Sequence, residues 1–87
     1  MNIKKGFVVK NVGEQSYVVA TGELVKSFKG MIRLNQTGRL LWDLIAEGND
    51  ADTMVTRLTD KYDVSEENAR RDVEAFIKVL ANKGILE

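Results

Sequence analysis

The sequence predicts an α+β fold in which a three-stranded antiparallel sheet is followed by three helices. Two observations lead to this class. Residues 7–34 are rich in valine and other β-forming residues and are interrupted by glycines, whereas residues 35–86 repeat their apolar side chains with a helical period. A segment of strands followed by a segment of helices is typical of α+β proteins. The length of 87 residues suits one small domain, which we expect to span residues 1–87.

Three segments have the composition of short strands and are bounded by glycine or turn-forming residues: 7–12, 17–21 and 31–34. The first segment lies between Gly6 and Gly13. The turn-forming residues 13–16 connect it to the second segment, so these two strands are expected to form a hairpin. Residues 22–30 are less regular and are predicted to be a loop with some extended character.

Three helices are expected, and each follows a residue whose side chain can accept a hydrogen bond from the free amides of the first turn: Asn35, Asp50 and Ser65. Gly48 and Gly84 follow the first and third helices, where glycine commonly ends a helix. The apolar stripes comprise Leu40, Leu41, Leu44, Ile45, Met54, Val55, Leu58, Ala69, Val73, Phe76, Ile77 and Leu80. Because residues 63–64 are a short connection, the second and third helices resemble a helix-turn-helix. With the small sheet beside them, the architecture is winged-helix-like, with the sheet first in sequence.

The chain contains no cysteine and no histidine, which removes several classes of function. Disulfide bonds, thiolate nucleophiles, zinc sites of the usual Cys/His kind and His-based catalytic triads are all excluded. The carboxylate pairs Asp50/Asp52 and Glu66/Glu67 lie at predicted helix starts, where capping and the helix dipole account for them. The sequence has neither a phosphate-binding loop nor a dinucleotide fingerprint. We therefore expect that the protein is not an enzyme and has no catalytic residues, metal site or cofactor.

Positive charge is concentrated near the N-terminus. The chain has 13 basic and 13 acidic residues, but residues 1–33 hold six basic and two acidic residues, a net charge of +4. The longest run of aliphatic and aromatic residues is residues 17–20, far short of the roughly 20 residues that a spanning helix needs. Since the N-terminus also lacks a signal-peptide pattern, we expect a cytoplasmic protein without a membrane partner.

The winged-helix-like arrangement makes nucleic-acid binding an alternative function. A recognition helix would present the start of the third helix to phosphates, and residues 65–72 carry Arg70 and Arg71 against three acidic side chains. Because phosphate contacts dominate affinity for DNA, this surface is unfavourable and no nucleic-acid partner is expected. Addition of a peptide strand to an open sheet edge, in contrast, requires neither histidine nor cysteine and suits a small neutral protein.

Two stretches of the sequence match a family pattern. Residues 28–38 read FKGMIRLNQTG and residues 41–45 read LWDLI. Together they resemble the central sequence pattern of the PqqD-like family. This pattern has a glycine and a hydrophobic residue before Leu-Asn-x-Thr-Gly/Ala, and Trp-x-Leu after it. The segments 62–64 and 69–76, with Leu80 and residues 84–86, are similar to the family's C-terminal half. The resemblance covers nearly the whole chain, most clearly residues 28–86. The N-terminal strands are less distinctive, and the loop of residues 22–30 carries no match.

The resemblance implies a RiPP recognition element, which binds the leader region of a ribosomally synthesised precursor peptide. Such a domain delivers the leader to a modifying enzyme, which for PqqD is a radical SAM protein. The family fold has three strands followed by three helices, the same order that the residues predict. In the family, the leader docks as an added strand on the third strand, in the groove beside the third helix.

The expected peptide-binding residues are Met31, Ile32, Arg33, Leu34, Asp72, Ala75, Phe76 and Val79. The backbone of the first four would pair with the leader, with Ile32 or Met31 facing the groove. At 100° per residue, one rim of the third helix is small, apolar and singly acidic, and an apolar rim on a helix indicates a partner. Arg33 and Asp72 would read opposite charges on the leader and so set its register. Phe76 is expected mainly in the core, where its edge can also line the groove.

Two more interpretations concern assembly. The expected partners are the precursor leader peptide and a modifying enzyme such as a radical SAM protein. An unpaired edge strand can also pair with a second copy, so a monomer or a weak dimer is expected. A pure oligomerisation or scaffold module remains a further alternative.

Two residues near the expected site have structural interpretations. Asn35 is interpreted as a helix cap and Trp42 as a core side chain, rather than as peptide contacts.

Overall fold

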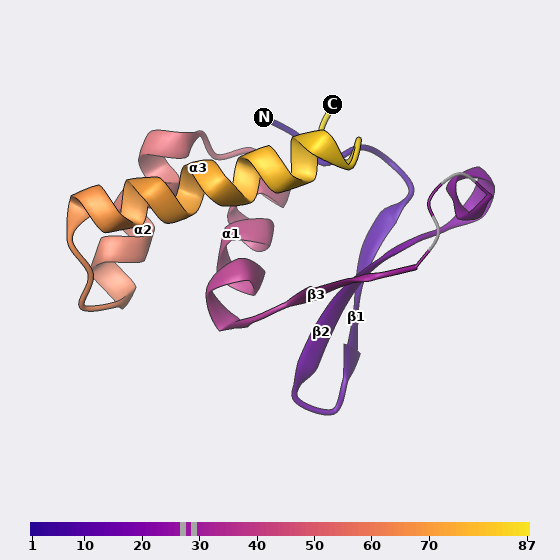
Figure 1. Ribbon diagram of the computed structural model, residues 1–87, viewed down its shortest axis with the longest axis horizontal. Coiled ribbons are helices and arrows are strands. Elements are labelled where there is room, and N and C mark those ends of the chain that lie inside the picture. Colours follow the sequence, from indigo (N-terminus) through magenta and orange to yellow (C-terminus); the bar gives the residue numbers. More distant parts are fainter. Residues whose placement is uncertain (27, 29) are drawn as a thin grey trace.

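The computed structural model describes residues 1–26, 28 and 30–87, and its elements follow the predicted order (Figure 1). In chain order they are β1 (Phe7–Val12), β2 (Gln15–Ala20), the 3-10 helix η1 (Gly22–Val25), β3 (Ile32–Leu34), α1 (Gln36–Ala46), α2 (Ala51–Lys61) and α3 (Glu66–Asn82). Figure 1 shows the long helix α3 running across α1 and α2, with the sheet at one end of this helical layer. The α+β class and the arrangement of three strands before three helices are confirmed.

The three strands form one antiparallel sheet in the order β1-β2-β3. The second strand begins at Gln15 rather than Tyr17, because Gly13 and Glu14 alone make the turn. Gly13 has a φ of 63°, a conformation that glycine adopts without the strain of a Cβ. The third strand begins at Ile32 rather than Met31, one residue later than expected.

The segment that follows the hairpin is more helical than predicted. Residues Gly22–Val25 form η1, where the sequence indicated a loop with extended character. Phe28 anchors this segment, since its ring meets the ring of Phe7 edge-on with 5.1 Å between the centroids. The part of the predicted loop at residues 27 and 29 lies outside the described residues.

Each helix begins with the predicted cap: Asn35 accepts from the Gly38 amide at 2.7 Å, Asp50 from Thr53 at 2.9 Å and Ser65 from Asn68 at 3.1 Å. The C-terminal end of α1 is also defined by residues that are close in sequence. Gly48 takes a positive φ of 90°, its N–H donates to the carbonyl of Ile45, and the N–H of Asn49 donates to the carbonyl of Leu44. This pair of bonds satisfies carbonyls that the helix leaves free, so short-range chemistry defines both ends of α1.

The core lies between the inner face of the sheet and the three helices. Its fully buried members come from both layers: Val18, Leu41, Ile45, Met54, Leu58, Ala69, Val73, Leu80 and Ile85. Most of the predicted stripe residues are in this core, but Leu40, Phe76 and Ile77 are half-buried. Phe76 is therefore less of a core residue than expected, because it lies at the edge of the α3 stripe, toward β3.

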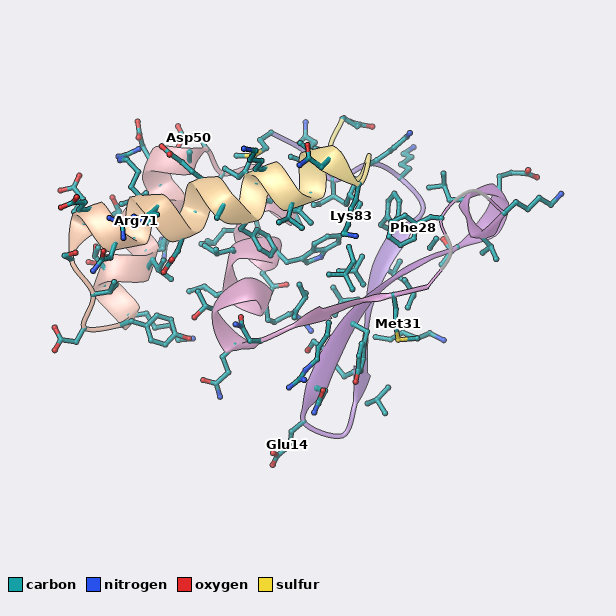
Figure 2. The ribbon with its side chains drawn as sticks, viewed as in Figure 1. Glu14, Phe28, Met31, Asp50, Arg71 and Lys83 are labelled. Atoms are coloured by element: carbon teal, nitrogen blue, oxygen red, sulfur yellow. The ribbon has the colours of Figure 1, made fainter. Side chains whose placement is uncertain are left out.

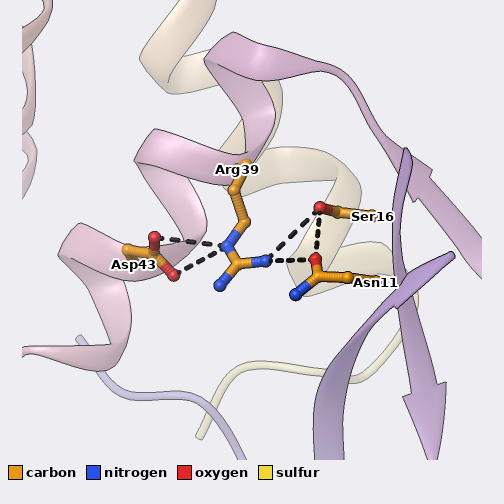
Figure 3. A network of polar contacts seen from close by, with 4 residues as sticks. All are labelled: Asn11, Ser16, Arg39 and Asp43. Carbon is orange, nitrogen blue, oxygen red and sulfur yellow. Dashed lines mark hydrogen bonds and ion pairs between the residues drawn. The ribbon is translucent and has the colours of Figure 1, made fainter. Parts of the chain in front are cut away.

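A polar network ties the hairpin to α1 (Figure 3). The Nε of Arg39 donates to both carboxylate oxygens of Asp43, at 3.1 and 3.2 Å. Its Nη1 reaches across to the sheet and donates to Asn11 Oδ1 at 2.9 Å and to Ser16 Oγ at 3.3 Å. The Arg39 guanidinium thus links Asp43, four positions along α1, with Asn11 of β1 and Ser16 of β2.

The two ends of the chain lie side by side (Figure 1). Ile3 and Leu86 form an antiparallel bridge, and the Lys4 N–H donates to the Ile85 carbonyl at 2.7 Å. After Gly84 the chain packs back onto the core, with Ile85 fully buried and Leu86 half-buried. Among the described residues, no helix is long and apolar enough to cross a membrane.

Candidate functional site

The first feature of the candidate site is the free edge of β3. This strand pairs with β2 through Ser16↔Leu34, Tyr17↔Arg33 and Val18↔Ile32. In the part of the chain that the structure describes, no strand pairs with its other edge. The backbone N–H and C=O groups on that side are therefore available to an extended chain, as they are on any open sheet edge.

Beside this edge lies a groove between β3, the start of α1, and α3. It consists of two adjoining hollows of about 470 and 340 Å³. The hollow nearer β3 is lined by Ile32, Arg33, Leu34, Asn35, Gly38, Phe76, Val79 and Leu80. The hollow nearer α1 is lined by Asn35, Thr37, Gly38, Leu41, Asp72, Ala75, Phe76 and Val79. Because four residues line both hollows, they form one continuous groove along α3.

The structure brings together seven of the eight predicted site residues in this groove: Ile32, Arg33, Leu34, Asp72, Ala75, Phe76 and Val79. Met31 is the exception. Its side chain is 61% exposed, and Figure 2 shows it on the side of β3 that faces away from α3. Alternate residues of a strand point to opposite faces, so Ile32 and not Met31 faces the groove. This resolves the register that the sequence left open.

The groove is apolar except for two charged lining residues. Its floor includes the fully buried side chains of Leu41 and Leu80. Asp72 on α3 is the one carboxylate among its described lining residues, and Arg33 on β3 is the one cation. Both are exposed. The groove therefore suits an extended segment that is mainly apolar and carries charge at few positions.

Sequence reasoning missed five lining residues: Asn35, Thr37, Gly38, Leu41 and Leu80. Asn35 was interpreted only as a cap, and it does cap α1, but it also lines both hollows. The overlooked signal is Gly38, since glycine within a helix costs about 1 kcal/mol relative to alanine and requires a reason. A Cβ at Gly38 would lie 3.2 Å from Asn35 Oδ1 and 3.5 Å from the Phe76 ring. Glycine thus lets α1 begin close to α3 and leaves the groove open.

Another hollow of about 460 Å³ lies between the hairpin turn, α1 and the end of α2. Glu14, Arg39, Asp43 and Lys61 give it a mixed polar lining. Arg39 and Asp43 are already bonded to each other, so these side chains serve the link between the hairpin and α1. Within residues 1–26, 28 and 30–87, no cluster of three or more acidic, histidine or cysteine side chains is arranged to hold a metal ion.

Comparison with known proteins identifies related sequences and folds. The family model described as coenzyme PQQ synthesis protein D (PqqD) matches residues 14–86. One similar solved structure is described as TbiB1 in complex with the TbiA(beta) leader peptide. It has a TM-score of 0.82 and 24% identity, and the match covers 100% of this chain and 95% of that one. Another is a lasso peptide synthetase B1 complexed with its leader peptide, with a TM-score of 0.82, 19% identity, and coverage of 99% and 95%. No curated protein sequence gives a match.

Proposed function

The chain belongs to the PqqD family, and from this premise we propose that it binds the leader region of a ribosomally synthesised precursor peptide. In this role it is a RiPP recognition element that presents the leader to a modifying enzyme and carries out no chemistry of its own. Both similar solved structures contain a leader peptide, which supports the same role here.

The observation that carries the proposal is the coincidence of an open strand edge and an apolar groove. An extended peptide that pairs with β3 gains main-chain hydrogen bonds, and alternate side chains of the same peptide point toward α3. The groove supplies apolar contacts for those side chains along Phe76 and Val79. Affinity would come from the backbone pairing, and specificity from the groove.

The two charges of the groove contact different residues of the leader in this arrangement. Arg33 is directly opposite Tyr17, so its side chain lies on the side of the sheet away from Ile32 and Leu34. Asp72 lies on the groove side. Alternate side chains of an added strand point to these two sides of the sheet. A basic leader residue on the groove side would therefore meet Asp72, and an acidic leader residue on the other side would meet Arg33.

The receiving enzyme is one that modifies the precursor, and a radical SAM protein is the partner that the family resemblance implies. Nucleic-acid binding is the less favourable alternative. Arg70 forms ion pairs with Asp52 and Glu66, and Arg71 forms one with Glu67. These arginines of α3 are already engaged by carboxylates, which leaves little free positive charge for phosphates.

Calorimetric titration with the leader peptide of the precursor encoded beside this chain tests the proposal. Ala75→Glu places a charge in the groove, and Asp72→Lys reverses the charge of its wall. Both residues are exposed, so circular dichroism and melting should show an intact fold. Each variant should bind the leader at least tenfold more weakly, a loss of about 1.4 kcal/mol.

Two matched substitutions on the solvent side of α3 serve as controls. Ala81→Glu repeats the alanine change and Glu74→Lys repeats the charge reversal, and neither residue lines the groove. Both controls should bind the leader like the parent protein. If the folded groove variants also bind like the parent, the site is not this groove.

A further inference from the structure

Gly38 differs from the other glycines of the chain in its backbone conformation. All seven glycines lie among the described residues, and six of them have a positive φ, which favours glycine. Gly38 instead has the helical conformation of the first turn of α1, which other residues adopt without strain. Because alanine favours a helix more than glycine does, the glycine at this position needs a reason other than the backbone.

The cap of α1 does not require a glycine either. In each α-helix the cap side chain accepts from the amide three residues later, which belongs to Gly38 in α1, Thr53 in α2 and Asn68 in α3. Threonine and asparagine carry a Cβ at this position and the same cap forms. A Cβ at Gly38 would lie 3.2 Å from Asn35 Oδ1, so the cap would have to yield by only a few tenths of an ångström. The fold thus tolerates a small side chain here.

What distinguishes position 38 from the other two cap positions is the groove. Gly38 is buried and lines both hollows, so its backbone forms the floor at the place where they meet. A Cβ would lie 3.5 Å from Phe76 Cε1 and 3.6 Å from Leu34 Cδ2, which are ordinary contact distances. A methyl group would therefore fit the fold, but it would fill the space between these two side chains and raise the floor of the groove.

We propose that Gly38 is a specificity-determining residue of the leader site, because the absence of a side chain there makes room for one bulky apolar side chain of the leader. The inference rests on the proposed leader-binding function. It adds the kind of leader residue that the groove selects, an aromatic or branched aliphatic one, and the position that sets how large this residue can be.

The surroundings of Gly38 favour an apolar side chain over a charged one. Arg33 lines only the hollow nearer β3, and Asp72 lines only the hollow nearer α1, so neither charge lines both hollows as Gly38 does. Asn35 Oδ1 is already engaged by the Gly38 N–H. Because the hollow nearer β3 extends to Gly38, a long side chain that points inward from a strand added to β3 reaches this floor, whereas a small one does not.

Gly38→Ala tests the inference with two measurements on one variant. Its melting temperature, followed by circular dichroism, should be no lower than that of the parent, because the backbone and the cap tolerate alanine. Calorimetry should show that it binds the leader peptide of the precursor encoded beside this chain at least tenfold more weakly. Asn68→Ala is the matched control, since it changes the same cap position of α3 at an exposed residue outside the groove. The control should bind the leader like the parent.

Leader analogues identify the side chain that Gly38 accommodates. Each apolar residue of the leader is replaced by alanine in turn, and every analogue is titrated against the parent and against Gly38→Ala. For one analogue the two proteins should bind equally, because a leader without the bulky side chain no longer meets the added Cβ. For the other analogues the tenfold difference should remain.

Three results would overturn the inference and leave the leader-binding proposal intact. Equal binding of the natural leader by the parent and Gly38→Ala would show that the leader does not use this space. A melting temperature below that of the parent would show that the fold itself requires glycine. A difference in affinity that persists with every analogue would show that alanine displaces α1 rather than meeting a leader side chain. A parent that binds no leader would instead overturn the leader-binding proposal, and this inference with it.

Discussion

Each α-helix of this protein begins at a cap made by its own sequence neighbours, whereas β3 depends on a strand more than a dozen residues earlier in the chain. The caps Asn35, Asp50 and Ser65 bond to amides three residues later. The three residues of β3, in contrast, are held by Ser16, Tyr17 and Val18 of β2. The candidate groove lies where these two kinds of structure meet, between a strand with one free edge and the apolar rim of α3.

The two regions also differ in how their charges are arranged. The arginines of α1 and the first half of α3 are paired with carboxylates of the helices: Arg39, Arg70 and Arg71. The strand cations Lys10 and Arg33 have no such partner among the described residues. Exposed pairs of this kind are typical of solvated helix faces and contribute little to stability.

The largest expected effect tests whether stability resides in the helical region. Leu58 on α2 is 1% exposed, so Leu58→Ala should lower the free energy of unfolding by about 2–5 kcal/mol through lost burial and a cavity. Urea unfolding measures this loss, which is a large part of the roughly 5–15 kcal/mol of a typical domain. Arg57→Ala, at the exposed neighbouring position, should change stability by less than about 0.5 kcal/mol. A loss for Leu58→Ala no larger than this control would contradict the assigned core.

The next change sharpens the boundary between core and groove. Phe76 is half-buried and lines both hollows, so Phe76→Ala should cost about 0.75–1.5 kcal/mol, roughly half of what full burial of the ring contributes. Leader affinity should fall at least tenfold in the same variant. Urea unfolding and calorimetry provide the two values. A loss of about 3–5 kcal/mol with unchanged leader affinity would return Phe76 to the core and remove it from the site.

A smaller effect tests the link between the two regions. Arg39→Gln removes the guanidinium that joins Asp43 to Asn11 and Ser16, and because the network is exposed it should cost less than about 1 kcal/mol. Its local effect should be clearer, since the hairpin loses its tie to α1. Amide hydrogen exchange should become faster in β1 and β2 and stay unchanged in α3. Equal exchange in the hairpin of the variant and the parent would show that the network does not restrain it.

The smallest effect concerns pH and a single helix end. The Thr53 backbone N–H, followed by the Thr53 side chain, donates to Asp50 and lowers the pKa of this carboxyl below its ordinary value of 3.8. Because the pKa is lower in the folded state, the stabilisation is present above pH 3.8 and is lost as the pH falls through the folded-state pKa. Asp50→Asn keeps an acceptor without a titrating group. The melting temperature of the parent should therefore exceed that of the variant at neutral pH, and the difference should shrink below pH 3.8. A difference that is constant with pH would rule out this contribution.

The sequence alone predicted the elements whose determinants are close together in the chain. All three helix caps and the C-terminal glycines of α1 and α3 were found, because a cap needs only a side chain and an amide three residues away. The rim of Asp72, Ala75 and Val79 was also predictable, since helical geometry places residues on a face without reference to the rest of the molecule.

Tertiary structure decided what depends on contact between distant segments. The pairing of β3 with β2 turned Ile32 into the groove and Met31 away from it. Strand pairing decides this because it sets which of the alternating side chains face the core. The approach of α1 to α3 gave Asn35 and Gly38 a second role as groove lining, and it left Phe76 half-buried rather than in the core. Spacing along one segment cannot reveal such roles, since the opposite wall of the groove comes from residues nearly 40 positions away in the chain.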